Sequence, residues 1–123
     1  MPVKPLSGSS LKSLLARIDF AREGEIRSVN PLSPTSIEIR FSVQDIARGY
    51  DWIDVRFQID GVRDAKLVSD NVLQTLDMSD GITIEIEPGK CGVAIGSYNS
   101  RVSEAPLYII GSSMGYEELS FSE

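Results

Sequence analysis

Apolar and polar residues alternate along much of this chain. The clearest run covers residues 37–43, where isoleucine, phenylalanine and valine alternate with glutamate, arginine and serine. Residues 53–59 and 82–86 repeat the pattern. A period of two places every other side chain on one face of a sheet. We therefore expect strands in these three segments, each with one buried face.

Turn residues indicate how two of these strands pair. Pro88-Gly89 suits a type II turn, and residues 91–95 beyond it are again apolar or small. If Pro88-Gly89 forms the whole loop, every inward pair is apolar: Ile86 with Cys91, Ile84 with Val93 and Ile82 with Ile95. The spacing therefore predicts a hairpin with this register.

A second hairpin is expected at Asp60-Gly61, because this dipeptide is typical of tight reversals between strands. A three-residue loop over 60–62 keeps the buried faces consistent, since it pairs Phe57 with Ala65 and Val55 with Leu67. A two-residue loop would set Phe57 against Asp64 instead. We therefore predict a bulge or a longer loop at this turn.

The remaining segments predict shorter elements. Leu11, Leu14, Leu15 and Ile18 follow the spacing of one helical face, with Ser9 or Ser10 as its cap. Short strands are expected over 25–29, before Asn30-Pro31, and as a last pair over 106–110 and 116–121. Residues 69–76 are ambiguous, because Asp70 could cap a helical turn that carries Val72, Leu73 and Leu76.

These elements predict an α+β fold that is mostly β. We expect one antiparallel sheet of about six to eight strands, curled as a roll or open barrel, with one N-terminal helix. The chain has 123 residues, which is a common size for a single domain. The opening is rich in Pro, Ser and Gly, so we expect a flexible arm over 1–8 and a globular domain over 9–123.

The composition argues against a catalytic role. Gly111-Ser112-Ser113-Met114-Gly115 has the G-x-S-x-G pattern of a hydrolase elbow, but the chain contains no histidine to activate Ser113. Too few residues follow Gly115 for the helix that such an elbow enters. We interpret the segment as a loop between the last two strands, and the chain as not an enzyme.

No metal or cofactor site is predicted either. Asp77-Met78-Ser79-Asp80-Gly81 resembles part of a calcium loop, but aligning its glycine puts Leu76 and Met78 where oxygen ligands are required. Residues 89–96 do not have the glycine spacing of a phosphate-binding loop. Glu85 and Glu87 share one strand face about 7 Å apart, but no neighbour in sequence would raise the pKa of either.

The net charge of −6 is uneven: residues 1–68 hold ten basic and nine acidic side chains, whereas 69–123 hold two and nine. Such an acidic half repels phosphate backbones and anionic lipid, so nucleic acid and membranes are poor partners. A basic protein partner is favoured. The lone Cys91 cannot form an internal disulfide, which favours the cytoplasm.

Small and aromatic residues suggest where neighbours pack. Gly92, Ala94 and Gly96 share the strand face opposite the isoleucines, where a close neighbour fits. We expect the N-terminal helix there, and association between copies of the chain is the alternative. Aromatic residues that are partly exposed in loops can anchor a protein interface. The candidates are Tyr50, Trp52, Tyr98 and Tyr116.

Trp52 and the run Gly61-Val62-Arg63-Asp64 lie within alternating strands of a small, acidic, histidine-free chain. Over residues 37–95 the chain resembles uncharacterised small bacterial β-rich domains, some of which are grouped with toxin-immunity proteins. The resemblance implies that the chain binds and neutralises a basic protein through an acidic face formed by residues 70–87 and 104–118.

The residues that we expect to contact this partner are Asp77, Asp80, Glu85, Glu87, Tyr98, Tyr116 and Glu117. The alternative function is a small-molecule carrier whose ligand lies inside the curled sheet. The two functions make different demands on the interior. A carrier needs a cavity lined by residues such as Phe41, Phe57 and Ile84, whereas an interaction domain packs them closely.

Overall fold

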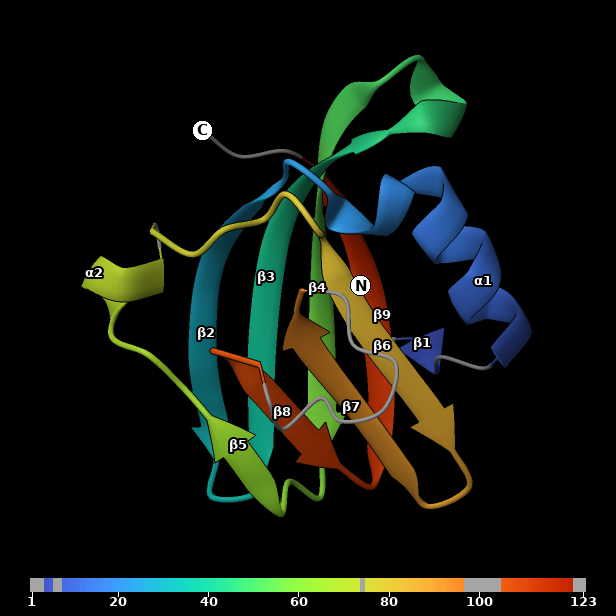
Figure 1. Cartoon of the computed structure of the whole chain (residues 1–123). Helices are drawn as coiled ribbons and strands as arrows, with labels where there is room; N and C mark the ends of the chain where they lie inside the picture. The colour runs from blue at the N-terminus through green and yellow to red at the C-terminus, as the bar shows by residue number, and fades with distance from the viewer. Residues whose placement is uncertain (1–3, 6–7, 74, 97–104, 121–123) are drawn as a thin grey trace.

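The strands form two antiparallel sheets that face each other (Figure 1). The computed structural model describes residues 4–5, 8–73, 75–96 and 105–120. Within them, a five-stranded sheet has the order β1-β9-β4-β3-β2 and a four-stranded sheet has the order β5-β8-β7-β6. The mostly-β prediction is confirmed. The prediction of a single curled sheet is wrong, because the strands divide between two layers.

The five-stranded sheet holds the two longest predicted strands at its centre. Its members are β1 (Lys4–Pro5), β9 (Ser113–Ser120), β4 (Asp51–Asp60), β3 (Ser36–Asp45) and β2 (Glu25–Ser33). β3 and β4 form a long hairpin, in which a single turn of 3-10 helix, η2 (Ile46–Arg48), precedes Gly49. The expected arm over 1–8 includes β1, which pairs with β9.

The four-stranded sheet contains β5 (Asp64–Lys66), β8 (Tyr108–Gly111), β7 (Lys90–Ile95) and β6 (Ile82–Glu87). The predicted register of β6 and β7 is confirmed, because Ile86 pairs with Cys91, Ile84 with Val93 and Ile82 with Ile95. Gly89 has a φ of +73°, as the third position of a type II turn requires.

The inward side chains of both sheets meet in one core. Phe41 of β3 and Phe57 of β4 are fully buried and pack edge to face, with ring centroids 6.0 Å apart. Val93 of β7 and Ile109 of β8 contribute from the opposite layer, and both are fully buried. The alternation in the sequence therefore predicted the core-facing side of β3 and β4 correctly, although Ser42 and Asp54 on the opposite side are also fully buried.

The predicted N-terminal helix is confirmed as α1 (Gly8–Arg17). The apolar residues Leu11, Leu14, Leu15 and Ile18 belong to the main core. The prediction that the helix covers the face of Gly92, Ala94 and Gly96 is therefore wrong. On that face Ala94 packs with Ala105, Tyr108 and Ile110. α1 lies along one side of the sandwich, beside β6 and β9 (Figure 1).

The opposite side carries a second, shorter helix, α2 (Asp70–Leu73), which contacts β2 (Figure 1). The prediction of one helix is therefore wrong. The second helix lies within residues 69–76, the segment whose sequence is ambiguous. None of the helices among the described residues is long and apolar enough to cross a membrane.

The two hairpins expected at Asp60-Gly61 and at Gly111–Gly115 are both wrong. β4 pairs with β3 and β9, and β5 pairs with β8, so the chain passes from one sheet to the other at Gly61. β8 pairs with β5 and β7, so the chain returns to the first sheet at Ser112. Phe57 faces Ile39 and Tyr116 instead of Ala65. At Gly61 and at Gly111-Ser112 the chain therefore passes between the two sheets and does not form a hairpin.

The two segments that cross between the sheets, Asp60-Gly61 and Gly111-Ser112, contact each other. The Ser112 N–H donates to the carbonyl oxygen of Asp60 at 2.9 Å. A Cβ atom on Gly111 would lie 2.6 Å from that same carbonyl oxygen, and one on Gly61 would lie 2.0 Å from Oγ of Ser112. The backbone of Asp60 therefore excludes a side chain at Gly111, whereas Gly61 is favoured by its φ of +63° and contacts the Ser112 side chain.

A partly buried ion cluster fixes the end of α1. Arg17 donates to Asp45 at 2.5 Å and to Glu118 at 2.7 Å, so the helix is tied to β3 and β9. Asp45 is fully buried and also accepts a hydrogen bond from the Ala47 N–H at 3.0 Å. The hydrogen bond from Arg17 lowers the pKa of Asp45 below its ordinary value.

We expect Gly111→Ala to destabilise the fold by about 2–3 kcal/mol, because a backbone oxygen must move to admit the methyl group. Gly49→Ala is the control: its φ is +65°, but nothing lies within 4 Å of the added atom, so the expected loss is about 1 kcal/mol. Urea unfolding measures both losses. An equal loss in the two variants would contradict the close approach of the crossings.

The Asp45 cluster predicts a loss of stability in acid. Because the folded pKa lies below the ordinary value of 3.8, the stabilisation is present above that pH and disappears as pH falls through the folded pKa. Asp45→Asn should cost about 2 kcal/mol at pH 7 and progressively less towards pH 2. Asp51→Asn, at an exposed site, should change stability by less than about 0.5 kcal/mol. Urea unfolding across this pH range checks both variants.

Candidate functional site

The structure separates the residues that were expected to form one acidic face. Asp77 and Asp80 are exposed in the turn between α2 and β6. Glu85 and Glu87 lie on β6, on the strand face opposite the isoleucines. Tyr98 and residue 104 lie outside the described residues.

The two predicted contacts on β9 belong to the other sheet. Tyr116 is partly buried and packs against the core. Glu117 is only 7% exposed and lies 3.6 Å from the guanidinium of Arg56, which also pairs with Glu38. These charges are on the outer face of the five-stranded sheet, whereas Glu85 is on the outer face of the four-stranded sheet. Glu117 and Glu85 therefore do not share a surface.

The aromatic residues suggested as anchors are also divided. Tyr50, Trp52 and Ile46 lie at the end of the β3–β4 hairpin. Their exposed fractions are 59%, 41% and 42%, respectively. This end projects beyond the sandwich in Figure 1. It forms a separate exposed apolar patch.

A left-handed turn links α1 to β2. Asp19, Phe20, Ala21 and Glu23 have φ values of 50°, 56°, 58° and 61°, and the first three form the 3-10 turn η1 (Asp19–Ala21). Left-handed backbone costs an L-residue roughly 1–2 kcal/mol. Such strain persists only where the surroundings hold it in place.

Tertiary contacts hold this turn. Ala21 is completely buried in the core, and the Glu23 N–H donates to the carbonyl oxygen of Met78 at 3.0 Å. Gly81 lies directly against the turn, because a Cβ there would be 2.0 Å from the carbonyl oxygen of Phe20. Residues 19–23 and 77–81 therefore form one packed unit, although they are far apart in sequence.

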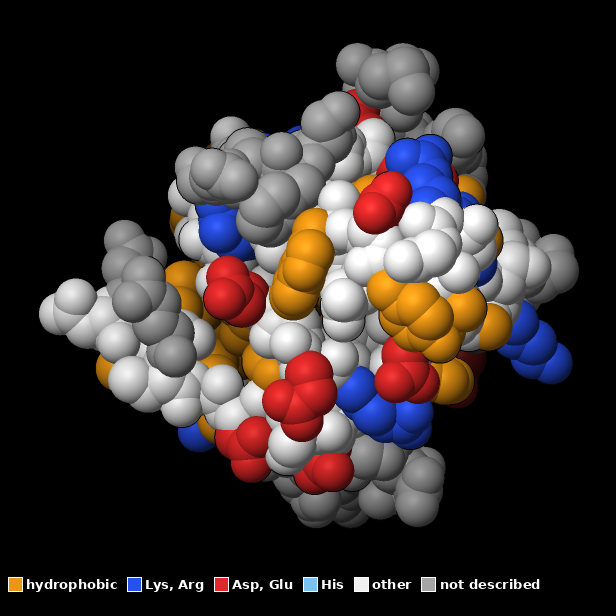
Figure 2. Space-filling model, turned by 90° about the horizontal axis from the view of Figure 1, so that it is seen from above, with side chains coloured by type: hydrophobic (Ala, Val, Ile, Leu, Met, Phe, Trp, Pro, Cys, Tyr) orange, Lys and Arg blue, Asp and Glu red, His pale blue; other side chains and the backbone are white. Residues whose placement is uncertain are grey.

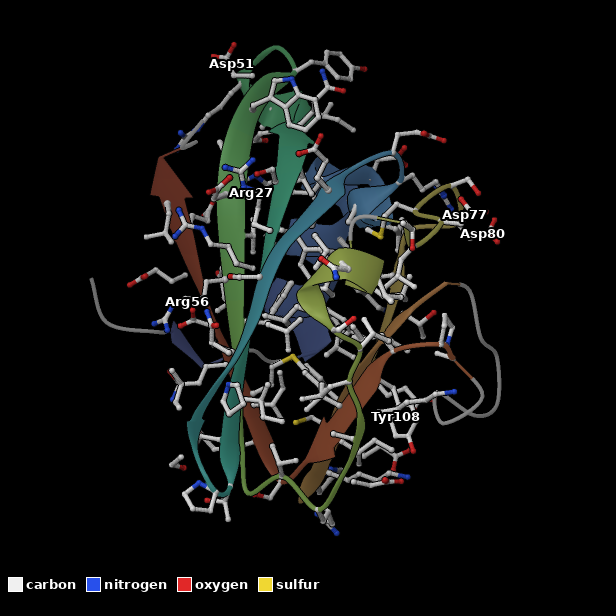
Figure 3. All side chains as sticks on the ribbon, turned by 90° about the vertical axis from the view of Figure 1, so that its left-hand side faces the viewer. Arg27, Asp51, Arg56, Asp77, Asp80 and Tyr108 are labelled. Carbon is white, nitrogen blue, oxygen red and sulfur yellow. The ribbon has the colours of Figure 1, made fainter. Side chains whose placement is uncertain are left out.

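The Asp77–Gly81 turn is locally satisfied. The Asp77 carboxylate accepts a hydrogen bond from the Ser79 N–H at 2.9 Å, which lowers the pKa of Asp77 and keeps it charged. The Gly81 N–H donates to Met78, and its φ of +71° explains the glycine. The turn presents Asp77 and Asp80 to solvent, and Figure 3 shows the two side chains close together at one side of the molecule.

A pocket of about 660 Å³ lies beside this unit, between the start of β2 and the chain that follows α2. Residues 24–27 line one wall, and Leu73, Leu76 and Met78 line the other. Ile26, Leu73 and Met78 are largely buried, so most of the surface that the pocket exposes is polar. The volume is within the range of ligand-binding pockets.

Acidic side chains border the pocket. Residues 19–27 and 77–80 contain five acids and two arginines, a net charge of −3. Both arginines face acids of their own segment: Arg22 lies 2.8 Å from Asp19, and Arg27 lies 3.7 Å from Glu25. Glu23, Asp77 and Asp80 are exposed, and we call these three residues the acidic rim.

The acidic rim occupies a limited part of the surface. Figure 3 places Arg27 and Arg56 towards the outer side of the five-stranded sheet, away from Asp77 and Asp80. Seen from above, acidic side chains are interspersed with basic and apolar ones (Figure 2). Within the described residues, no three Cys, Asp or Glu side chains are grouped as metal ligands.

Sequence reasoning found only part of this site. Asp77 and Asp80 are predicted to contact a partner, and Val72, Leu73 and Leu76 are predicted to lie on a possible helical turn, which in the structure ends at Leu73. Glu23 and the pocket were missed, because Phe20 and Ala21 carry no local signal for left-handed backbone. Gly81 and Gly24 are the signals that could have indicated close approaches here.

The left-handed turn predicts an unusual effect of glycine. Glu23→Gly should stabilise the fold by about 0.5–1 kcal/mol, because relief of left-handed strain exceeds the added entropy of the unfolded chain. Glu25→Gly removes the same side chain from ordinary extended backbone and should destabilise by about 0.5–1 kcal/mol. Thermal unfolding measures both, and a loss of stability in Glu23→Gly would contradict the strained turn.

Comparison of the chain with protein-family models, with curated proteins and with solved structures found no match.

Proposed function

We propose that this chain is a non-catalytic interaction domain that binds a basic protein through the acidic rim. The observation that carries the proposal is the placement of Glu23, Asp77 and Asp80 next to the pocket, because each acid lies within two residues of a lining residue, Gly24 or Met78. An apolar anchor surrounded by complementary charge is the usual composition of a protein interface. All three carboxylates are exposed, so they are accessible to a cationic partner.

The packing of the interior favours this function over the carrier. Phe41 and Phe57 contact each other, and Ile84 packs against the same core. A ligand between the sheets would have to displace these side chains. The pocket is instead at the side of the sandwich, between β2 and the chain after α2.

The resemblance to domains grouped with toxin-immunity proteins supports a toxin as the class of partner, and we propose neutralisation by binding as the outcome. Cys91 is buried, and burial raises the pKa of its thiol. A protected lone thiol suits a reducing compartment, so we propose the cytoplasm as the location.

Affinity capture from the native cell tests the proposed function. The tagged chain should retain a basic protein in stoichiometric amount near 0.05 M salt and release it near 0.5 M, because salt screens exposed charges. The doubly substituted variant Asp77→Lys/Asp80→Lys should lose this protein. Glu85→Lys/Glu87→Lys changes the net charge equally on β6 and should retain it.

The variants also define failure. Retention of the same protein by Asp77→Lys/Asp80→Lys, or a complex that is insensitive to salt, would contradict binding through the acidic rim. Recovery of a small metabolite and no protein would favour the carrier instead.

A further inference from the structure

β2 is an edge strand, and no described strand pairs with its outer side, although α2 contacts it. In the described part of the sheet, β2 is the last strand and pairs with β3 alone. Edge strands present backbone donors and acceptors to any extended chain that approaches them. Pro31 disrupts the far half of this edge. Residues 25–29 contain no proline, although the register with β3 shifts between Ile26 and Ser28. The open half of the edge is therefore the half that begins at the pocket.

The chain after α2 approaches this edge without extending the sheet. Its backbone meets the segment before β2 where the Glu23 N–H donates to Met78. Beyond that point the two segments diverge and enclose the pocket, with Ile26 on one wall and Leu73 and Leu76 on the other. Figure 3 shows β2 passing beside α2 on this side of the molecule. An added strand at residues 25–29 would direct alternate side chains towards the pocket.

Charge identifies the kind of strand that fits. The acidic rim surrounds the end of the edge where β2 begins, and Glu23 directly precedes the pocket wall. Arg22 lies against Asp19, and Arg27, which lines the pocket, lies 3.7 Å from Glu25. A lysine or arginine beside the apolar positions of an added strand would face these carboxylates.

We propose that the partner docks as an extended segment that pairs with the edge of β2. Apolar side chains at alternate positions enter the pocket, and flanking basic side chains meet the acidic rim. This inference rests on the proposed function and specifies the form of the partner. Strand addition of this type obtains affinity from backbone hydrogen bonds and specificity from pockets for alternate side chains.

A synthetic peptide provides the probe: valine alternates with threonine between flanking lysines. Titration calorimetry should detect a Kd below about 1 mM, and NMR should show the largest amide shifts at residues 25–29. In a strand, alternate N–H groups point to opposite sides. N-methylation of either all valines or all threonines should therefore abolish binding, whereas the other methylated peptide should bind as the parent does.

Variants of the protein test the pocket. Leu76→Trp fills the pocket and should raise the Kd of the peptide by about tenfold or more. Leu67→Trp makes the same change at a leucine that is 41% exposed and does not line the pocket, and should leave the affinity unchanged. Circular dichroism of both variants confirms that they remain folded.

The outcomes separate this inference from the proposed function. Three results would overturn strand addition. They are no binding of the peptide up to about 1 mM, equal binding of both N-methylated peptides, and equal affinities of the two tryptophan variants for the peptide. Each of these results leaves the capture experiment intact. Retention of the captured protein by Asp77→Lys/Asp80→Lys overturns the proposed function, whatever the peptide does.

Discussion

The backbone contact between Asp60-Gly61 and Gly111-Ser112 is the constraint on which this architecture depends. The central strand pair β4 and β9 of one sheet continues into β5 and β8 of the other at this contact. The hydrogen bond from Ser112 to Asp60 joins the two crossings, and the glycines let them approach within van der Waals distance. The facing layers are thereby held together, so Phe57 can pack against the opposite sheet.

A sandwich that is joined in this way leaves its two sides to be covered by other segments. α1 covers one side and is fixed by Arg17, whose two ion pairs join it to β3 and β9. The other side is covered by the chain around α2, which meets the edge of β2 at few points and leaves the pocket open. The strained turn, the acidic rim and the open edge all occur there. Strain is tolerated because buried Ala21 and the Met78 carbonyl hold the turn.

Local sequence patterns predicted the structure correctly where an element depends only on residues that are close together in the sequence. The β6–β7 register follows from Pro88-Gly89 and apolar pairing, and α1 follows from leucine spacing. The same reasoning failed at Asp60-Gly61, because a glycine permits a reversal within one sheet and a crossing between sheets equally well. It also missed the pocket, whose walls come from residues 24–27 and 73–78 and meet only in the folded chain.

The sequence by itself determined which side of the long strands β3 and β4 faces the core, that Leu11, Leu14 and Leu15 share one helix face, and that no histidine is available for catalysis or metal binding. It did not determine where the helix begins, because Ser9 and Ser10, the expected caps, lie inside α1. Only the tertiary structure decided which strands share a sheet and which acids share a surface. Alternation specifies a face but not a neighbour, because backbone hydrogen bonds are the same for every strand. The neighbour is selected by packing and by close approach at Gly61 and Gly111. This selection places Glu117 opposite Arg56 and leaves Asp77 and Asp80 beside the pocket.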